Sequence, residues 1–300
     1  MYKGNDIAPR SSASFVSMTT ECSVLVYDTD ISMSEIEKVF DLVRQNTLRL
    51  EKKYSFYNQD SYLNKVINNR ETKEVLLDDE TANVLSIVRE ISSLTNGYFD
   101  ITMGTLKHCY KESTKKAMQK SLDELTPQTG FDYWDIKDNK LYFKYPKTKL
   151  DLGGVIKEYA IDEAVKIIKE HKIKSAIVNF GGDISTIGSK PDGNPFGVAI
   201  KNPLNKEQDI VLINLFNKAL TTSANTERWF EIEGERFPHI QSKQNISSEV
   251  ISATIIADSA LISGIFSTAF MIGTNIDIPD FIKVALIDKD LRLHQNILAQ

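Results

Sequence analysis

The sequence predicts an α+β fold in which a mostly antiparallel sheet is flanked by helices. Apolar residues recur at helical spacing in the first third of the chain, whereas short apolar runs bounded by turn residues follow one another in the second half. Strands that succeed one another without intervening helices favour antiparallel pairing. With 300 residues, 41% of them hydrophobic, the chain is long enough to bury a sizeable core.

The first half is expected to contain a strand, two amphipathic helices and a polar region of weak helical character. In chain order these are residues 22–28, 34–53, 79–96 and 107–130. Two short strand-like runs follow, near residues 134–136 and 140–145, on either side of Asp138-Asn139. That dipeptide between β-rich runs predicts a tight hairpin.

The second half is expected to supply most of the sheet. Strands are predicted near residues 175–178, 197–200, 210–216, 228–232 and 249–256, with a final pair of short strands at the end of the chain. No charge occurs in residues 259–276, which is nearly long enough to span a bilayer. Serines, a threonine and glycines interrupt this stretch, so we expect a buried helix and no transmembrane segment.

Two glycine pairs mark turns that another group can approach closely. Gly153-Gly154 ends a strand-like segment, residues 149–152, and opens a helix that carries Lys157 in its first turn. Free N–H groups at a helix start, together with a lysine, suit a phosphate ligand. The alternative is a simple strand-to-helix turn with a solvated Lys157. The second pair is Gly181-Gly182.

Charge and cysteine content narrow the class of protein. The 36 basic and 41 acidic residues give a net charge of −5, which argues against nucleic-acid binding. Cys22 and Cys109 have no metal-site spacing and allow at most one disulfide. The first residues lack the apolar core of a secretory signal, so we expect a cytoplasmic chain or one whose export signal has been removed. The sequence is compatible with either cellular compartment.

Eight short motifs occur in an order that resembles one known family. They are Phe15 to Thr20, Ser55-Phe56-Tyr57 with Ser61, Thr95 to Thr102, Asp151 to Asp162, Asn179 to Asp183, Thr222-Ser223, Pro238-His239-Ile240, and Ser252-Ala253-Thr254 with Ser267-Thr268-Ala269. Over nearly its whole length the chain thereby resembles the ApbE-type flavin transferases. These enzymes use Mg²⁺ to cleave the pyrophosphate of FAD and attach FMN to a Ser or Thr hydroxyl of a target protein. The resemblance implies one ApbE-like domain over residues 1–300, of T-fold-like architecture, with a helical insert near residues 107–130.

The resemblance also implies an FAD site. Its lining residues would be Met18, Tyr57, Tyr98, Phe99, Asp100, Asp151, Lys157 and Ile240. Aromatic faces bury flat heterocycles at low entropic cost, carboxylates accept from ribose or ring N–H groups, and a lysine offsets pyrophosphate charge. For Tyr98 and Phe99 the alternative is a place in the hydrophobic core.

His239 is the candidate catalytic base. In the family this position lies beside the flavin, and a neutral imidazole near a phosphoryl centre can take the proton of an attacking hydroxyl. The alternative is a structural or solvated histidine.

The metal site departs from the family pattern. There Mg²⁺ is held by a backbone carbonyl at the position of Gly154, by a threonine hydroxyl at that of Thr268, and by an aspartate whose position reads Gly264 in this chain. Without the carboxylate we expect weak Mg²⁺ binding. Asp258 could substitute only if the local path differs. Glu158 replaces a family glycine and would repel the pyrophosphate unless it turns outward.

Two functions follow from these matches and departures. The first is an FAD-binding flavin transferase that attaches FMN to a Ser or Thr of a flavin-acceptor protein, with weakened or lost metal-dependent activity. The second is a catalytically degenerate FAD-binding protein that acts as a flavin carrier, sensor or assembly factor. Fold alone does not separate them.

Overall fold

An eight-stranded antiparallel sheet forms the centre of the molecule in a computed structural model, which describes residues 7–224, 229–238 and 249–297. Its strands, in spatial order, are β1 (Ser11–Ser17), β2 (Thr20–Val26), β6 (Ala176–Phe180), β7 (Asp183–Ile187), β10 (Ala219–Ala224), β13 (Val250–Ala257), β14 (Lys283–Asp288) and β15 (Leu293–Gln295). Every neighbouring pair is antiparallel. The predicted α+β class with a mostly antiparallel sheet is therefore confirmed.

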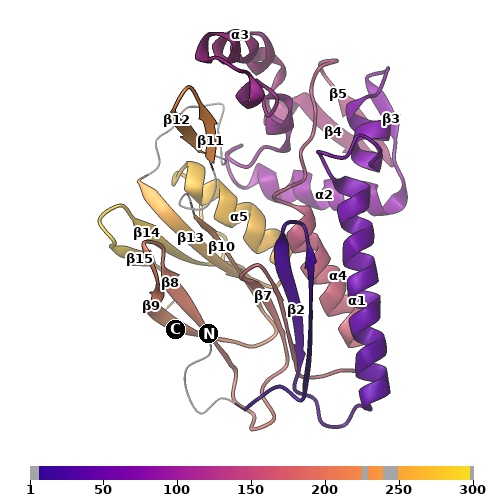
Figure 1. The fold of residues 1–300 in the computed structure, drawn as a ribbon, viewed down its shortest axis with the longest axis vertical. Helices are drawn as coiled ribbons and strands as arrows, with labels where there is room; N and C mark the ends of the chain where they lie inside the picture. Colours follow the sequence, from indigo (N-terminus) through magenta and orange to yellow (C-terminus); the bar gives the residue numbers. More distant parts are fainter. Residues whose placement is uncertain (1–6, 225–228, 239–248, 298–300) are drawn as a thin grey trace.

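The two faces of this sheet are covered by different elements. Alternate side chains of a strand point to opposite faces, and on β6 Val178 joins the core beneath the helices whereas Ile177 joins a second core. Helices α1 (Met33–Tyr54), α4 (Ile156–Glu170) and α5 (Ala260–Ile272) pack on the first face. The hairpin of β8 (Phe196–Asn202) and β9 (Asn205–Leu215) covers the second. Figure 1 shows α1 and α4 side by side along the sheet.

A smaller layer extends the helical side. It contains α2 (Asp79–Ser93), a π-helical turn at Leu63–Asn68, and a three-stranded sheet in the order β3 (Glu74–Leu76), β5 (Lys140–Phe143), β4 (Trp134–Lys137). Asp138 and Asn139 both adopt positive φ, 51° and 57°, between β4 and β5. This conformation is that of the two-residue hairpin predicted from the dipeptide.

The polar region 107–130 forms a small cap with its own apolar cluster. Helix α3 (Lys115–Leu125) and the short helical turns around it place Leu106, Cys109 and Met118 against Ile232. Ile232 belongs to the hairpin of β11 (Trp229–Ile232) and β12 (Glu235–Pro238), which lies at the same end of the molecule in Figure 1. The cap thus rests on the hairpin that leads into residue 239.

Helix α5 is the buried helix predicted from residues 259–276. Its first turn is fixed by Asp162 of α4, whose carboxylate accepts from Ser259 Oγ (2.6 Å) and from the amides of Ala260 (2.7 Å) and Leu261 (3.0 Å). Burial raises the pKa of Asp162. No helix within the described ranges is both long and apolar enough to cross a membrane.

The segment 149–152 is extended but is not a strand, contrary to the prediction. The amide of Leu150 donates to Asn68 Oδ1 (2.8 Å) and its carbonyl accepts from Asn68 Nδ2 (2.9 Å). The amide of Asp151 donates to the carbonyl of Ile101 (2.8 Å). A side chain and a helical turn take the place of a neighbouring strand, because both satisfy the backbone groups of an apolar extended run.

Candidate functional site

The turn at Gly153-Gly154 is open to solvent and leads into α4, as the glycine motif predicted. Both glycines are exposed, α4 begins at Ile156, and Lys157 lies in its first turn. The amide of Gly153 donates to Asp151 Oδ1 (3.0 Å), which fixes the entry to the turn. The start of α4 thus directly follows two exposed glycines.

Lys157 is held by two buried carboxylates. Its ammonium group forms an ion pair with Asp183 and lies 3.1 Å from Glu158 Oε1. Asp183 Oδ1 also accepts from the amide of Thr222 (3.1 Å). The side chain of Lys157 is 25% exposed, so it is neither fully solvated nor shut away from a ligand at the turn.

Glu158 turns inward, not outward. Its side chain is only 6% exposed and lies over Gly264 of α5, where an added β-carbon would come 2.5 Å from Cγ of Glu158. Its Oε1 faces Lys157, whereas Oε2 is buried without a hydrogen-bond partner. The missing side chain at position 264 is what makes room for this carboxylate.

Gly154 and Thr268, the two residues implied as metal ligands, lie close together. A β-carbon at Gly154 would be 4.0 Å from Thr268 Oγ1 and 3.5 Å from Phe99 Cε2. Ser223 Oγ on β10 lies 3.5 Å from Thr268 Oγ1. Asp258 is not part of this arrangement, because its side chain is 69% exposed and pairs with Lys218.

The described ranges contain no group of three or more His, Cys, Asp or Glu side chains that could hold a metal ion. A cation beside Thr268 would therefore need further oxygen ligands in addition to one or two carboxylates, such as hydroxyls, carbonyls or the phosphates of a ligand.

Three of the predicted flavin-binding residues have structural roles, and one of them borders this turn. Phe99 is buried in the main core and borders Gly154. Tyr98 packs so tightly on Gly273 that a β-carbon there would lie 2.5 Å from its Cζ. Asp100 caps the short helix Ile101–Thr105 by accepting from the amide (2.9 Å) and hydroxyl (2.7 Å) of Thr102. The core alternative thus holds for Phe99, while its ring edge still reaches the turn.

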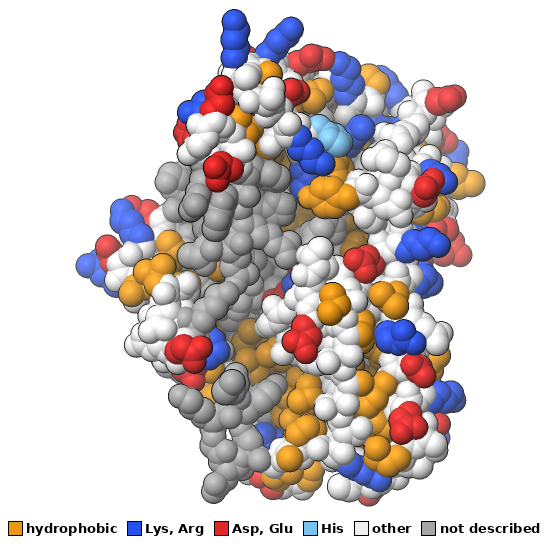
Figure 2. Space-filling model, viewed as in Figure 1, with side chains coloured by type: hydrophobic (Ala, Val, Ile, Leu, Met, Phe, Trp, Pro, Cys, Tyr) orange, Lys and Arg blue, Asp and Glu red, His pale blue; other side chains and the backbone are white. Residues whose placement is uncertain are grey.

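Lys107 contacts both Tyr57 and Asp151. Tyr57 is 59% exposed, and the ammonium groups of Lys107 and Lys111 each lie 5.2 Å from its ring centroid. Lys107 also forms an ion pair with Asp151. Figure 2 shows basic side chains and a histidine gathered around hydrophobic side chains near the α3 end of this face. An exposed aromatic ring flanked by cations suits a flat, anionic ligand.

Met18 lies at a hairpin turn next to the second glycine pair. Met18 and Thr19 have positive φ (51° and 62°) between β1 and β2, and Gly181 and Gly182 have positive φ (65° and 97°) between β6 and β7. A β-carbon at Gly181 would overlap the side chain of Thr20. The predicted close approach at this pair is therefore made by the neighbouring hairpin, while the space around Gly182 is open.

Some site residues were not singled out from the sequence, and others cannot be placed. Asp183 stands directly after Gly181-Gly182, which is a usable signal, whereas nothing in the sequence connects Lys107 with Asp151. His239 and Ile240 lie outside the described residues.

Both cysteines are free thiols in the structure. Burial raises the pKa of Cys22 to about 11, so its thiol stays protonated at neutral pH.

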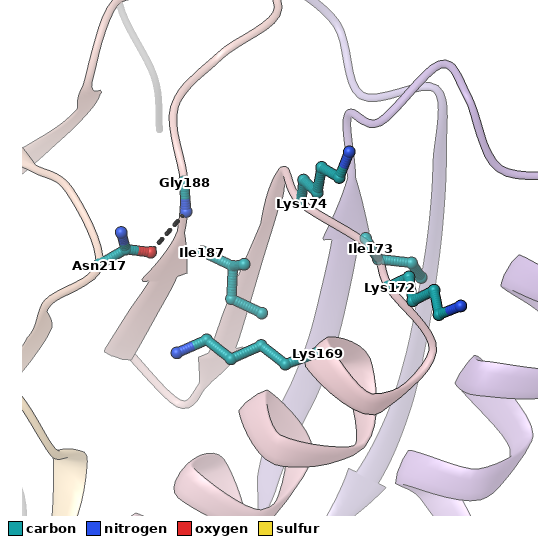
Figure 3. Close-up of a pocket in the computed structure, with 7 residues that line it drawn as sticks. All are labelled: Lys169, Lys172, Ile173, Lys174, Ile187, Gly188 and Asn217. Atoms are coloured by element: carbon teal, nitrogen blue, oxygen red, sulfur yellow. Dashed lines mark hydrogen bonds between the residues drawn. The ribbon is translucent and has the colours of Figure 1, made fainter.

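A shallow hollow at the C-terminal end of α4 is unrelated to this site. Lys169, Lys172, Lys174, Ile187 and Asn217 contribute to its lining. Figure 3 shows Lys169 reaching toward Asn217, whereas Lys172 and Lys174 point away. The three ammonium groups do not converge on one point, and none of the predicted site residues lies there.

Comparison with known proteins gives a consistent family match. The model of the ApbE family matches residues 18–287. The FAD:protein FMN transferase of Escherichia coli (strain K12) is 24% identical over 231 residues, which span 73% of this chain and 66%, just under two thirds, of that protein. The FAD:protein FMN transferase of Vibrio cholerae serotype O1 is 23% identical over 256 residues, 82% of this chain and 75% of that protein.

Two solved structures share the fold. The apbe protein of Thermotoga maritima superposes with a TM-score of 0.82 at 24% identity, covering 95% of this chain and 96% of that chain. The flavin transferase ApbE of Vibrio cholerae gives a TM-score of 0.81 at 21% identity, with the same coverage of 95% and 96%.

Proposed function

The chain belongs to the ApbE family, and from this premise we propose that it binds FAD and transfers FMN to a Ser or Thr hydroxyl of a flavin-acceptor protein. Relatives that bear the name FAD:protein FMN transferase support this proposal. The single observation that carries it is the open turn at Gly153-Gly154, with Lys157 in the first turn of α4. A pyrophosphate fits there because helix N–H groups and a lysine both favour negative charge.

In this proposal the remaining site residues surround the two ends of FAD. Tyr57, with its flanking lysines, offers an exposed ring face, and Phe99 closes the floor beside Gly154. Asp151 and Asp100 offer carboxylate oxygens, and Met18 borders the site from the β1–β2 turn. His239 as the base and Ile240 as a flavin contact stay predictions from the sequence.

We propose that the reaction uses Mg²⁺ held next to Thr268 and the carbonyl of Gly154. The buried, unpartnered Oε2 of Glu158 supports a cation here, because such an oxygen otherwise loses its hydration without replacement. When bound, the ion would neutralise charge on the bridging phosphate oxygens. Lys157 would hold the pyrophosphate, and the exposed turn would admit the acceptor hydroxyl.

We further propose that residues 1–300 work as a single domain, with residues 107–130 as an insert that closes one end. One core cluster that extends from the sheet to α1, α2, α4 and α5 supports this view. The cap adds its own small cluster and contacts the β11–β12 hairpin.

The decisive experiment is incubation of the protein with FAD, MgCl₂ and a flavin-acceptor domain. Transfer predicts release of AMP and a covalent, fluorescent FMN adduct on the acceptor, seen as a mass increase of the FMN moiety. An acceptor whose target hydroxyl residue is replaced by alanine serves as the control. Stable FAD binding with neither AMP nor adduct would contradict transfer and favour the flavin carrier, sensor or assembly factor.

A further inference from the structure

We propose that Glu158 is the carboxylate ligand of the divalent cation and binds it together with the hydroxyl of Thr268, between α4 and α5. The inference deepens the proposed function and rests on it, because that function calls for a cation at this place. It differs from the expectation that the metal site has lost its carboxylate at position 264.

The first argument is the unpaired oxygen of Glu158. Four side-chain polar atoms in the described ranges are buried without a partner: Arg70 Nε, Ser92 Oγ, Trp134 Nε1 and Glu158 Oε2. Of these, only the last belongs to an anion. A carboxylate that is 94% buried and has one free oxygen carries a desolvation cost that a bound cation removes.

The second argument is the local balance of charge. Glu158 and Asp183, whose side chains are 6% and 5% exposed, share the single ammonium group of Lys157. In formal charges, two carboxylates and one ammonium group leave the trio at −1, and the amide of Thr222 satisfies only an oxygen of Asp183. Buried charge is normally paired or coordinated to metal, so the surplus points to a cation on the Glu158 side.

The third argument is the seam between the two helices. Gly154 precedes Glu158 by four residues across the start of α4, and Gly264 precedes Thr268 by four within α5, which is about one helical turn. Glu158 lies over Gly264, while Gly154 faces Thr268, so the two segments run in opposite directions along one seam. A carboxylate, a hydroxyl and an exposed glycine turn therefore lie along the same seam.

The donor set fits a hard cation with few protein ligands. Mg²⁺ and Mn²⁺ prefer oxygen donors, and Mg²⁺ is commonly bound by one or two carboxylates together with substrate phosphates. Because Gly153 and Gly154 are exposed, the remaining positions stay accessible to a diphosphate and to water. Glu158 thus reaches from α4 to the place that a carboxylate on α5 at position 264 would occupy.

The test measures Mn²⁺ binding to the whole chain, with and without FAD. Electron paramagnetic resonance of the free ion serves as the readout. Glu158→Gln keeps the shape and removes the charge, so Mn²⁺ affinity should fall by about tenfold or more. Asp258→Asn removes an exposed carboxylate near α5 and should change affinity less than about twofold. Wild-type affinity in Glu158→Gln, with an unchanged circular dichroism spectrum, would overturn the assignment.

A second variant moves the carboxylate across the seam. Glu158→Gly combined with Gly264→Asp should recover Mn²⁺ affinity to within about threefold of the wild type, and a folded variant as weak as Glu158→Gln would contradict the placement. AMP release is recorded in parallel. Loss of Mn²⁺ binding in Glu158→Gln without AMP release by the wild type would support the ligand and contradict the transferase. If the wild type and Glu158→Gln release AMP equally well, the transferase function is supported and the assignment of Glu158 as the ligand is contradicted.

Discussion

Glu158 and Gly264 face each other across α4 and α5 so closely that a β-carbon at position 264 would lie 2.5 Å from Cγ of Glu158. Each departs from the family pattern, and taken singly each counts against a working site. Because the two positions are in contact, the departures are linked. The side chain of Glu158 on α4 fills the space that a side chain at position 264 on α5 would need.

The first prediction tests this contact through stability. Gly264→Ala should lower the free energy of unfolding by about 1–3 kcal/mol, because the added methyl group overpacks against Glu158. In the Glu158→Gly background the same change should be neutral or stabilising by up to about 1 kcal/mol, since alanine favours a helix over glycine. Urea denaturation of the four proteins gives the coupling, and additive effects of the two changes would contradict the contact.

Sequence patterns predicted the elements whose periodicity is strong. The amphipathic helices α1 and α2, the buried helix α5, and the β4–β5 hairpin are found within a few residues of their expected positions. Strands β1 and β10 were missed because their sequences, SSASFVS and ALTTSA, are rich in small polar residues. They are strands because neighbours in the sheet satisfy their backbone, which a local pattern does not contain.

The candidate site was only partly predictable for a related reason. Gly153-Gly154 and Lys157 belong to one local turn, so their arrangement followed from spacing. The inward direction of Glu158 depends on the register between α4 and α5, which Asp162 sets through its three hydrogen bonds to the start of α5. Such tertiary contacts between residues about 100 positions apart leave no periodic trace in one sequence.

The second prediction concerns Lys157. Lys157→Ala should weaken FAD binding by about tenfold or more, because it removes a charge-assisted contact and leaves Asp183 and Glu158 unpaired beside the pyrophosphate. Quenching of flavin fluorescence measures the affinity. Lys169→Ala, at the opposite end of α4, is the matched control and should bind FAD like the wild type. Equal affinities of the two variants would refute the pyrophosphate position.

The third prediction is an acid dependence of stability. Arg49 and Lys53 of α1 hold the pKa of Glu80 on α2 at about 2, well below its usual value of 4.5, mainly through the hydrogen bonds from Arg49. A lowered folded-state pKa contributes stability above the unfolded value, and this stability is lost as pH falls from about 4.5 toward about 2. Glu80→Gln should cost about 2 kcal/mol at pH 7 and flatten this part of the pH profile. Thermal melts of the wild type and of Glu80→Gln from pH 7 to pH 2 provide the comparison, and identical pH profiles of the two proteins would contradict the prediction.

The fourth prediction concerns the support beneath the turn. A β-carbon at Gly104 would lie 2.7 Å from the amide nitrogen of Asp151 and 2.8 Å from the carbonyl carbon of Leu150. Both are backbone atoms, which have no rotamer to adopt, so Gly104→Ala should displace the segment that carries Asp151. We expect a loss of about 3 kcal/mol in unfolding free energy, at the upper end for overpacking, and weaker FAD binding as Asp151 moves away from Gly153.

Gly197→Ala is the matched control for this change. The nearest atoms that a β-carbon there would meet belong to the side chain of Leu212, the first at 3.5 Å, which is ordinary van der Waals contact. The residue lies on β8, whose hairpin covers the opposite face of the sheet from α4. Gly197→Ala should therefore change the free energy of unfolding by less than about 1 kcal/mol and leave the FAD affinity unchanged. If Gly104→Ala were as mild as Gly197→Ala, the segment before Gly153 would be free to shift, and the turn would lose its role as a fixed platform for the pyrophosphate.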